Sequence, residues 1–310
     1  MDKKTLIPPF EGPLEDFPPM ELLPEGVKVL HLEDTFRYDF NMIPCVTYAS
    51  RTGEDQHLHI LQPRDRKDPD AKFPLVVFVQ GSAWHRQEVF QHLPHMIRVC
   101  QQGFVVAMVE YRPSDIAPFP AQMQDAKTAI RFLRMNAEQY HIDASKVALW
   151  GDSSGGHTAV IAGITGDRQP DSDLYGEYSC QVQCIVDWYG PMDIAKMNCV
   201  PSVQDHIQPD SPEGYLIGQK NVLENPQLVA PTIPMNYLSR DVETPPVLIM
   251  HGSRDHLVNF EQGCMLYTAL KELGKEVEMY KLEGAYHAFG GFNCEQVIDI
   301  SVDFIRKHLK

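Results

Sequence analysis

The chain has 310 residues, of which 43% are hydrophobic and 22% are charged, a composition typical of a folded globular protein rather than a disordered or fibrous one. Its 27 basic and 42 acidic residues give a net charge of −15, which argues against nucleic-acid binding because the phosphate backbone is itself negative. The apolar runs are as short as β-strands and well below the roughly 18 residues of a membrane-spanning helix, so we expect no membrane function.

The cysteines and the first residues of the chain bear on its cellular location. The 7 cysteines are odd in number and form no C-x-x-C pair, which is typical of reduced thiols rather than of a disulfide framework. The first residues, MDKKTLIPPFEGPLEDFPPM, carry prolines and acids where a signal peptide needs an apolar core. Both features indicate a cytoplasmic protein.

The first predicted elements are strands at the edge of a sheet. Residues 28–62 contain three strand-like stretches with no helical pattern between them, VKVLHL, IPCVTYA and HLHILQP. Strands joined without a crossover helix pair antiparallel, so we expect antiparallel edge strands. His57 and His59 alternate on one face of the last stretch, as two metal ligands would, but no third ligand and no H-E-x-x-H motif accompanies them. We therefore expect no metal site.

From residue 75 onward, short apolar runs alternate with helical patterns. Each run ends in glycine or a polar residue, which favours central strands of a mostly parallel sheet; the runs are 75–80, 104–111, 147–152, 184–190 and 246–252. The residues between and after them repeat apolar side chains at helical spacing, as at Met123, Ala126, Ile130 and Leu133. This alternation predicts an α/β fold with helices on both faces of the sheet.

Residues 191–245 interrupt the alternation with eight prolines and weak periodicity. A segment of this length inside a compact domain is typical of a functional insertion. We therefore expect one domain over residues 1–310, with edge strands at about 28–62 and a small inserted lid at about 191–245.

The sequence GDSSGGH at residues 151–157 carries the strongest catalytic signal. It fits G-x-S-x-G, follows the strand-like VALW and precedes a helical pattern, which is the context of a nucleophile elbow. Ser153 is the nucleophile in this register, because a nucleophilic Ser154 would need glycine at position 152, which is Asp152. The tight turn explains the glycines on either side, since bulky residues there would clash.

A serine nucleophile needs a base, and the base needs an acid to orient it. In this fold the expected chain order is serine, acid, histidine. Asp255 follows the apolar run 246–252, and His287 follows a further strand-like stretch at 276–282. We predict His287 as general base and acid, with Asp255 holding its imidazole, and we keep Asp187 and Asp193 as competing acids beyond an earlier strand.

The tetrahedral intermediate also needs hydrogen-bond donors for its oxyanion. The backbone N–H of Ser154, directly after the nucleophile, is one predicted donor. The loop after residues 75–79 reads QGSAW, with small residues that let the backbone approach a substrate oxygen. We interpret it as the second part of the oxyanion hole.

Motifs spread over residues 75–290 resemble those of one family. The family's H-G-G-x-W loop corresponds to Gln80–Trp84, its Y-R pair to Tyr111-Arg112, and its F-P-A…D…A helix to Phe119–Ala121 with Asp125 and Ala129. Its G-D-S-[AS]-G-G-H elbow corresponds to Gly151–His157 and its Y-G-P-x-D element to Tyr189–Asp193. Its H-G-x-x-D-x-x-V element corresponds to His251–Val258, and its terminal H-x-F to His287–Phe289. The chain therefore resembles the α/β-hydrolase carboxylesterases related to hormone-sensitive lipase, nearest their acetyl-esterase and feruloyl-esterase-like branch.

This resemblance implies an α/β-hydrolase fold with a mostly parallel central sheet, helices on both faces and a small inserted lid. It also implies that the N–H groups of Ser82 and Ala83 are oxyanion donors and that Trp84 lines the pocket as a substrate contact or packs near it; a plain core position for Trp84 stays equally open. Two residues depart from the family pattern. Gln80 replaces a histidine, and Ser82 replaces a glycine, so that a Cβ restricts the backbone at a donor position.

The predicted function is hydrolysis of carboxylic esters through an acyl-enzyme. By resemblance the acyl group is small, acetate first and hydroxycinnamoyl second, and the substrate is a small-molecule ester or an oligosaccharide ester. An amidase or formamidase like kynurenine formamidase, or a peptidase, is the alternative on the same triad. A non-catalytic binding protein is the remote one. No cofactor is implied, and the oligomeric state stays open.

Overall fold

The computed structural model describes residues 8–13, 16–22, 24–29, 38–65, 68–168 and 174–310. Contacts between residues divide the chain into two units, residues 1–36 and residues 37–310. In the first unit, the described residues are exposed, and the rings of Phe10 and Phe17 meet edge to face at 5.3 Å. The strands and helices described below belong to the second unit.

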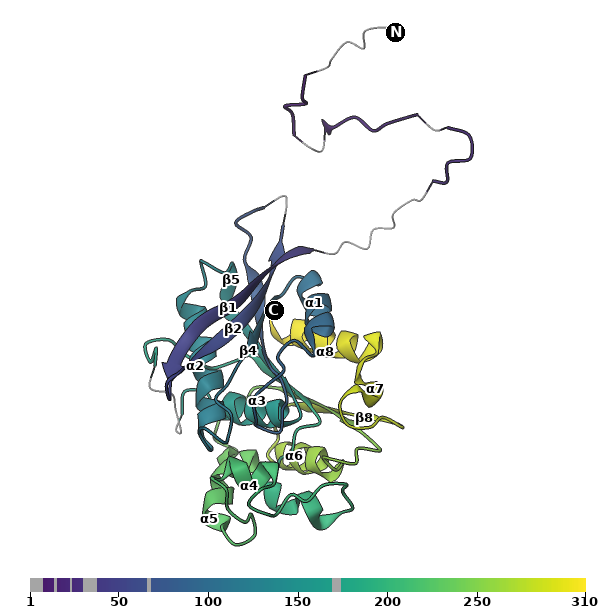
Figure 1. Cartoon of the computed structure of the whole chain (residues 1–310). Coiled ribbons are helices and arrows are strands. Elements are labelled where there is room, and N and C mark those ends of the chain that lie inside the picture. The colour runs from purple at the N-terminus through teal and green to yellow at the C-terminus, as the bar shows by residue number, and fades with distance from the viewer. Residues whose placement is uncertain (1–7, 14–15, 23, 30–37, 66–67, 169–173) are drawn as a thin grey trace. The chain divides into compact units, whose positions relative to one another are not determined.

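An eight-stranded sheet forms the centre of the second unit (Figure 1), in the order β1-β2-β4-β3-β5-β6-β7-β8. β1 pairs antiparallel with β2, and β2 pairs antiparallel with β4, whereas all other neighbours are parallel. The strands are β1 (Asp39–Arg51), β2 (Glu54–Arg64), β3 (Phe73–Val79), β4 (Val105–Val109), β5 (Ile142–Asp152), β6 (Cys184–Trp188), β7 (Val247–Gly252) and β8 (Val277–Leu282). The parallel strands therefore end at one edge, where the loops after them meet.

Helices cover both faces of this sheet (Figure 1). Alternate residues of one strand face opposite sides, so each strand contributes to two cores. In β3, Val77 joins the core beneath α2 (Ala121–Met135), α3 (Ser154–Thr165) and α6 (Glu261–Glu272). Phe78 joins the core beneath α1 (Leu93–Gln101) and α8 (Glu295–His308), the last helix after the short α7 (Phe289–Phe292). The two cores hold the sheet rigid beneath the loops.

The predicted α/β fold with a mostly parallel sheet is confirmed. The five apolar runs form β3, β4, β5, β6 and β7, and the antiparallel edge strands are β1 and β2. Of the VKVLHL stretch, residues 30–32 lie outside the described residues, and the described residues 27–29 do not form a strand. None of the described helices is both long enough and apolar enough to cross a membrane.

The chain between β6 and β7 contains only short helices. They are η2 (Ile194–Cys199), α4 (Pro212–Leu216), α5 (Pro226–Val229), η3 (Ala230–Thr232) and η4 (Pro234–Tyr237). Four of the five begin at or just after proline or a polar cap, which explains both the prolines and the weak periodicity of this stretch. Its apolar side chains form a third core with Trp84 of the loop after β3; they are Ile194, Leu216, Ile217, Val222 and Val229.

Candidate active site

Ser153 occupies a sharp turn between β5 and α3. Its φ of 52° lies in the left-handed region that L-residues rarely adopt, as expected for a nucleophile elbow. The flanking glycines are required by contact: a Cβ on Gly151 would lie 2.2 Å from the Gly155 carbonyl oxygen, and one on Gly155 would lie 2.0 Å from the Val79 carbonyl oxygen. The turn presents the serine hydroxyl at the edge where the parallel strands end.

The structure brings the three predicted side chains together. Ser153 Oγ lies 3.0 Å from His287 Nε2, and His287 Nδ1 lies 2.7 Å from Asp255 Oδ2. Because Nδ1–H donates to the carboxylate, Nε2 is free to accept the serine proton. Asp255 comes from the loop after β7 and His287 from the loop after β8, so three neighbouring parts of one sheet edge supply the three groups.

Hydrogen bonds fix the charge and orientation of Asp255. Its Oδ1 accepts from the amides of Leu257 and Val258 at 3.0 and 2.9 Å, and its Oδ2 lies 3.5 Å from His251 Nε2. Burial would raise the pKa of Asp255, but hydrogen bonds from His251 and His287 lower it well below the usual carboxyl range. The group is therefore an anion beside the imidazole, suited to stabilise an imidazolium.

The two competing acids lie in other surroundings. Asp193 caps η2 through the Ala195 amide and pairs with Lys196 at 2.9 Å. Asp187 is fully buried at the end of β6, where its Oδ1 accepts from the Gly190 amide at 3.0 Å. Burial raises the pKa of Asp187 to about 7, so this carboxyl keeps its proton far above the usual range. Neither acid has a hydrogen bond to His287 among the described residues.

Asp187→Asn is expected to raise the free energy of unfolding at about pH 8 and to change it little at about pH 4. In the unfolded chain Asp187 ionises near pH 4, but in the folded protein it stays protonated up to about pH 7, so the wild type loses stability as pH rises between these values. An amide is neutral throughout and can still accept from Gly190. Urea unfolding at both pH values measures the effect, and a variant equally shifted at both would contradict it.

The predicted oxyanion loop contacts the elbow through one of its own donors. The Ser82 amide donates to Ser154 Oγ at 2.9 Å, so this predicted donor already has a partner. The Ala83 amide has no hydrogen-bond acceptor among the described residues, and Ala83 and Trp84 both have positive φ, 55° and 57°. Among the three predicted donors, the amides of Ala83 and Ser154 are thus the two without an acceptor in the described part of the chain.

Three hydroxyl groups form a network behind this loop. Ser82 Oγ lies 2.8 Å from the Tyr111 hydroxyl, which lies 3.4 Å from Ser154 Oγ, and Ser82 Oγ also donates to the His85 carbonyl at 2.6 Å. Burial raises the pKa of Tyr111 to about 12, so its hydroxyl keeps its proton and remains a donor. The serine that replaces the family glycine at position 82 is thus tied into the network.

Trp84 is a core side chain in this structure. It is 1% exposed and packs in the third core, with its ring 5.3 Å from that of His157 in the elbow sequence. Apolar residues of the 191–245 segment surround it, which is the packing position left open for Trp84, and a substrate contact of this residue stays a prediction. His157 Nε2 donates to the Thr232 carbonyl at 2.6 Å, a second link from the elbow to that segment.

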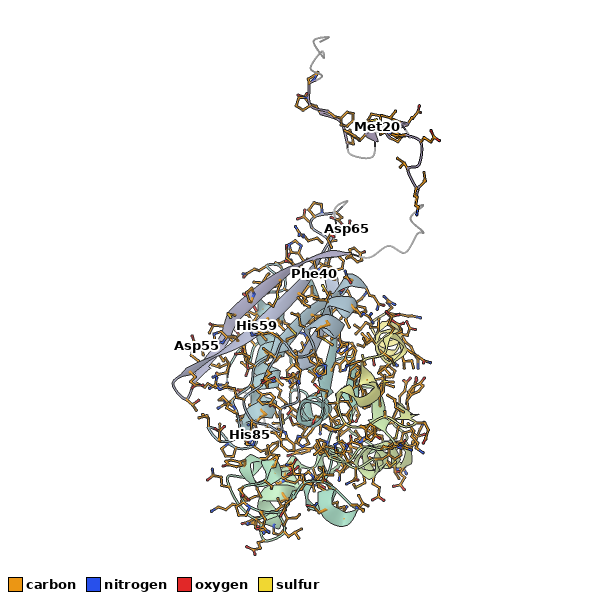
Figure 2. All side chains as sticks on the ribbon, turned by 45° about the vertical axis from the view of Figure 1, so that its right-hand side comes forward. Met20, Phe40, Asp55, His59, Asp65 and His85 are labelled. Carbon is orange, nitrogen blue, oxygen red and sulfur yellow. The ribbon has the colours of Figure 1, made fainter. Side chains whose placement is uncertain are left out.

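His85, next to Trp84, is partly exposed at the same edge. Figure 2 shows it beside the short helices that follow β6, and its ring lies 5.1 Å from that of Tyr215 on α4. These two side chains come from the oxyanion loop and from the 191–245 segment, so both segments border the space next to the predicted donors.

A second Ser–His–acid arrangement lies within the 191–245 segment. His206 Nδ1 donates to Glu213 Oε1 at 2.8 Å, and its Nε2 lies 3.0 Å from Ser202 Oγ. Ser202 Oγ is also 3.2 Å from the carbonyl oxygens of His256 and Leu257. This arrangement ties the segment to the loop that carries Asp255.

The predicted absence of a metal site was based on His57 and His59. Both histidines bind one carboxylate: His57 Nδ1 and His59 Nε2 lie 3.1 and 2.9 Å from the two oxygens of Glu110. Figure 2 marks His59 on β2, away from His85. In the part of the chain that the structure describes, no group of three or more His, Cys, Asp and Glu side chains could hold a metal ion.

His251, Tyr189 and Asp152 lie in the motifs of the sequence, but no functional role was predicted for any of them. The structure adds contacts for each: His251 with Asp255, the Tyr189 ring 4.8 Å from the His287 ring, and Asp152 with the Gly81 amide at 2.9 Å. The sequence did contain a signal for Asp152: an acidic residue that ends a buried strand directly before the nucleophile needs hydrogen-bond partners, because burying a carboxylate without them is costly. Its partners come from distant segments, so the sequence did not identify them.

Comparison with known proteins agrees with this fold. The pattern of the BD-FAE family matches residues 58–270. Esterase LipC of Mycobacterium tuberculosis is 28% identical over 241 residues, which cover 76% of this chain and 58% of LipC, so the chain spans little more than half of that relative.

Two solved structures are similar over most of the chain. A truncated carbohydrate esterase from gut microbiota is 30% identical, with a TM-score of 0.74 over 88% of this chain and 98% of that one. A bifunctional GH43-CE protein of Bacteroides eggerthii is 28% identical, with a TM-score of 0.75 over 87% of this chain and 38% of that one.

Proposed function

Because the chain belongs to the BD-FAE family of α/β-hydrolase esterases, we propose that it hydrolyses carboxylic esters through an acyl-enzyme on Ser153. The observation that carries this proposal is the continuous hydrogen-bonded line from Ser153 Oγ through His287 to Asp255, at 3.0 and 2.7 Å. It lies at the edge of the sheet where α/β proteins place their ligands.

In the first half of the reaction, His287 Nε2 takes the proton of Ser153 as Oγ attacks the ester carbonyl carbon. The carbonyl oxygen becomes an oxyanion that the amides of Ala83 and Ser154 stabilise, with Ser82 joining if its bond to Ser154 Oγ exchanges. His287 then gives the proton to the leaving alcohol, and the bond between carbonyl carbon and alcohol oxygen breaks.

In the second half, a water replaces the alcohol. His287 accepts a proton from the water as its oxygen attacks the acyl carbon, and then returns that proton to Ser153 Oγ as the acid leaves. Asp255 stays ionised through both halves, because its low pKa keeps the proton on the imidazole. No redox step and no cofactor is needed for this sequence.

The proposed substrates are short-chain esters, acetyl-like first, with a carbohydrate as the alcohol. The two similar carbohydrate-esterase structures support the alcohol. A polar cleft of about 110 Å³ is bordered by Arg86, Gln87, Glu110 and Tyr111, and its carboxylate and amide groups suit sugar hydroxyls; Ser153, Asp255 and His287 are not among the residues that line it. The cytoplasm is the proposed compartment, supported by seven free thiols.

The test compares p-nitrophenyl acetate with p-nitrophenyl decanoate. We expect kcat/KM to be at least about tenfold higher for acetate, because a short acyl pocket excludes the longer chain. Acetylated xylose is assayed alongside as the sugar ester. The amide substrate is p-nitroacetanilide, which has the same acyl and aromatic groups as p-nitrophenyl acetate. Equal or faster turnover of decanoate would contradict the short acyl group, and amide turnover without ester turnover would overturn the proposed reaction.

A further inference from the structure

Asp152, the residue before the proposed nucleophile, carries a buried carboxylate with partners from three segments. The residue is 3% exposed. Its Oδ1 accepts from the Gly81 amide at 2.9 Å, and its Oδ2 lies 3.3 Å from His92 Nε2 and 3.4 Å from the Tyr189 hydroxyl, which donates to it. A carboxylate removed from water needs such partners, and this one collects them around the nucleophile.

On one side, Asp152 holds the oxyanion loop against the elbow. A Cβ on Gly81 would lie 2.4 Å from the Asp152 carbonyl oxygen and 2.7 Å from Ser153 Cβ, so the two backbones are already in close contact. The Gly81 amide bonded to Asp152 is directly followed by the amides of Ser82 and Ala83. The carboxylate therefore sets how near those amides lie to the carbon that Ser153 attacks.

On the other side, Asp152 reaches the imidazole of His287 through Tyr189. The Tyr189 ring packs edge to face on the His287 ring at 4.8 Å and on Phe292 at 4.3 Å, which fixes the plane of the base. The hydroxyl of the same tyrosine donates to Asp152. Asp152 therefore contacts the predicted oxyanion loop directly, through Gly81, and the predicted base indirectly, through Tyr189.

Charged and hydrogen-bonding neighbours keep Asp152 ionised. Burial would raise the pKa of Asp152, but the charge and hydrogen bond of His92, the Gly81 amide and the charge of His287 lower it overall. The other ionisable groups that interact with it are His95, whose Nδ1 lies 3.3 Å from His92 Nδ1, and Tyr111, Tyr189 and Asp187. Asp152 is therefore an anion at neutral pH, and its hydrogen bonds to Gly81 and Tyr189 are charge-assisted.

We propose that Asp152 is a second positioning carboxylate of the active site, which holds the oxyanion loop through Gly81 and orients the imidazole of His287 through Tyr189. This inference rests on the proposed ester hydrolysis. The charge of the carboxylate and its tether to Gly81 can be separated by substitution.

The experiment compares Asp152→Asn with Asp152→Ala on p-nitrophenyl acetate. Asparagine keeps an oxygen for the Gly81 amide and removes the charge, so kcat should fall about tenfold with little change in KM. Alanine removes the tether as well, and kcat should fall about 100-fold.

The matched control is Asp167→Asn. Asp167 also accepts from a backbone amide, that of Cys180 at 2.7 Å, and pairs with Arg131, but it lies after α3 at the other edge of the sheet. We expect this control to keep the wild-type kcat and KM. An Asp152→Asn variant with wild-type kcat, or a loss of kcat that Asp167→Asn reproduces, would overturn the inference.

Fluorophosphonate labelling of Ser153, read by intact mass, separates this inference from the proposed function. A labelled, active wild type, together with an Asp152→Asn variant that has a lower kcat and a nearly unchanged KM, supports the inference. An unlabelled and inactive wild type overturns the proposed function and the inference with it. An active wild type matched by Asp152→Asn overturns the inference alone, and this comparison holds even if Asp152→Ala fails to fold.

Discussion

Ser153→Ala is expected to lower kcat for p-nitrophenyl acetate by at least about 10⁴-fold, because no other nucleophile can take its place at the elbow. Ser153 Oγ is the hydroxyl that faces His287 Nε2, at 3.0 Å. The methyl group of alanine fits the same left-handed turn as the serine Cβ, so the fold should remain and the dissociation constant of a competing product should change little. Steady-state rates and fluorophosphonate labelling both measure the loss.

The matched control is Ser202→Ala, because Ser202 is also hydrogen-bonded to a histidine that binds an acid but does not lie in a nucleophile elbow beside the oxyanion loop. Its Oγ lies 3.0 Å from His206 Nε2, and His206 lies 2.8 Å from Glu213. The carbonyl oxygens of His256 and Leu257 surround it, and an oxyanion there would be repelled. We expect this variant to keep most of its activity and the label to appear on Ser153. Labelling of Ser202, or turnover that survives in Ser153→Ala, would refute the assignment.

Asp255→Asn is expected to lower kcat by about 10⁴-fold, because an amide at this position donates to Nδ1 and holds the imidazole in the wrong tautomer. His287 Nδ1–H now donates to Asp255 Oδ2 at 2.7 Å, which leaves Nε2 to accept the serine proton. In the variant, Nε2 carries the proton instead and cannot act as the base. The loss should shrink as pH rises and a water or hydroxide replaces the base.

Asp193→Asn is the control for this variant. Asp193 follows β6, where some α/β-hydrolases place the acid, but here it caps η2 and pairs with Lys196. We expect its esterase activity to stay near that of the wild type. If Asp193→Asn lost as much activity as Asp255→Asn, the acid would have been assigned to the wrong strand end.

The parallel strands could be predicted from the sequence because burial on both faces of a strand requires apolar residues at consecutive positions. A run such as LVVFVQ is buried on both faces, so it is apolar at every position, and the structure places it in β3 between β4 and β5. The elbow was equally readable, since a tight turn needs small residues at fixed distances from Ser153. Asp255 and His287 followed from the strands that precede them.

The contacts between loops could not be read in this way. That the Ser82 amide donates to Ser154 Oγ depends on how closely the loop after β3 approaches the elbow, and no spacing in the sequence encodes that distance. The family resemblance left Trp84 either at the pocket or in the core. The apolar side chains that cover it come from residues 191–245, whose short helices have no readable period. Partners far apart in sequence become evident only in the folded chain.

The packing of Trp84 has an evolutionary consequence. If the segment of residues 191–245 is the predicted lid, it sets substrate range, yet it packs on Trp84 and bonds to His157, which belong to the oxyanion loop and to the elbow. Mutations in this segment that widen or narrow the substrate range therefore also disturb the oxyanion loop and the nucleophile elbow, which set the reaction rate. Selection on the two properties is not independent here, so divergence in specificity is expected to accumulate in the stretches of the segment farthest from this junction, while the junction itself stays constant.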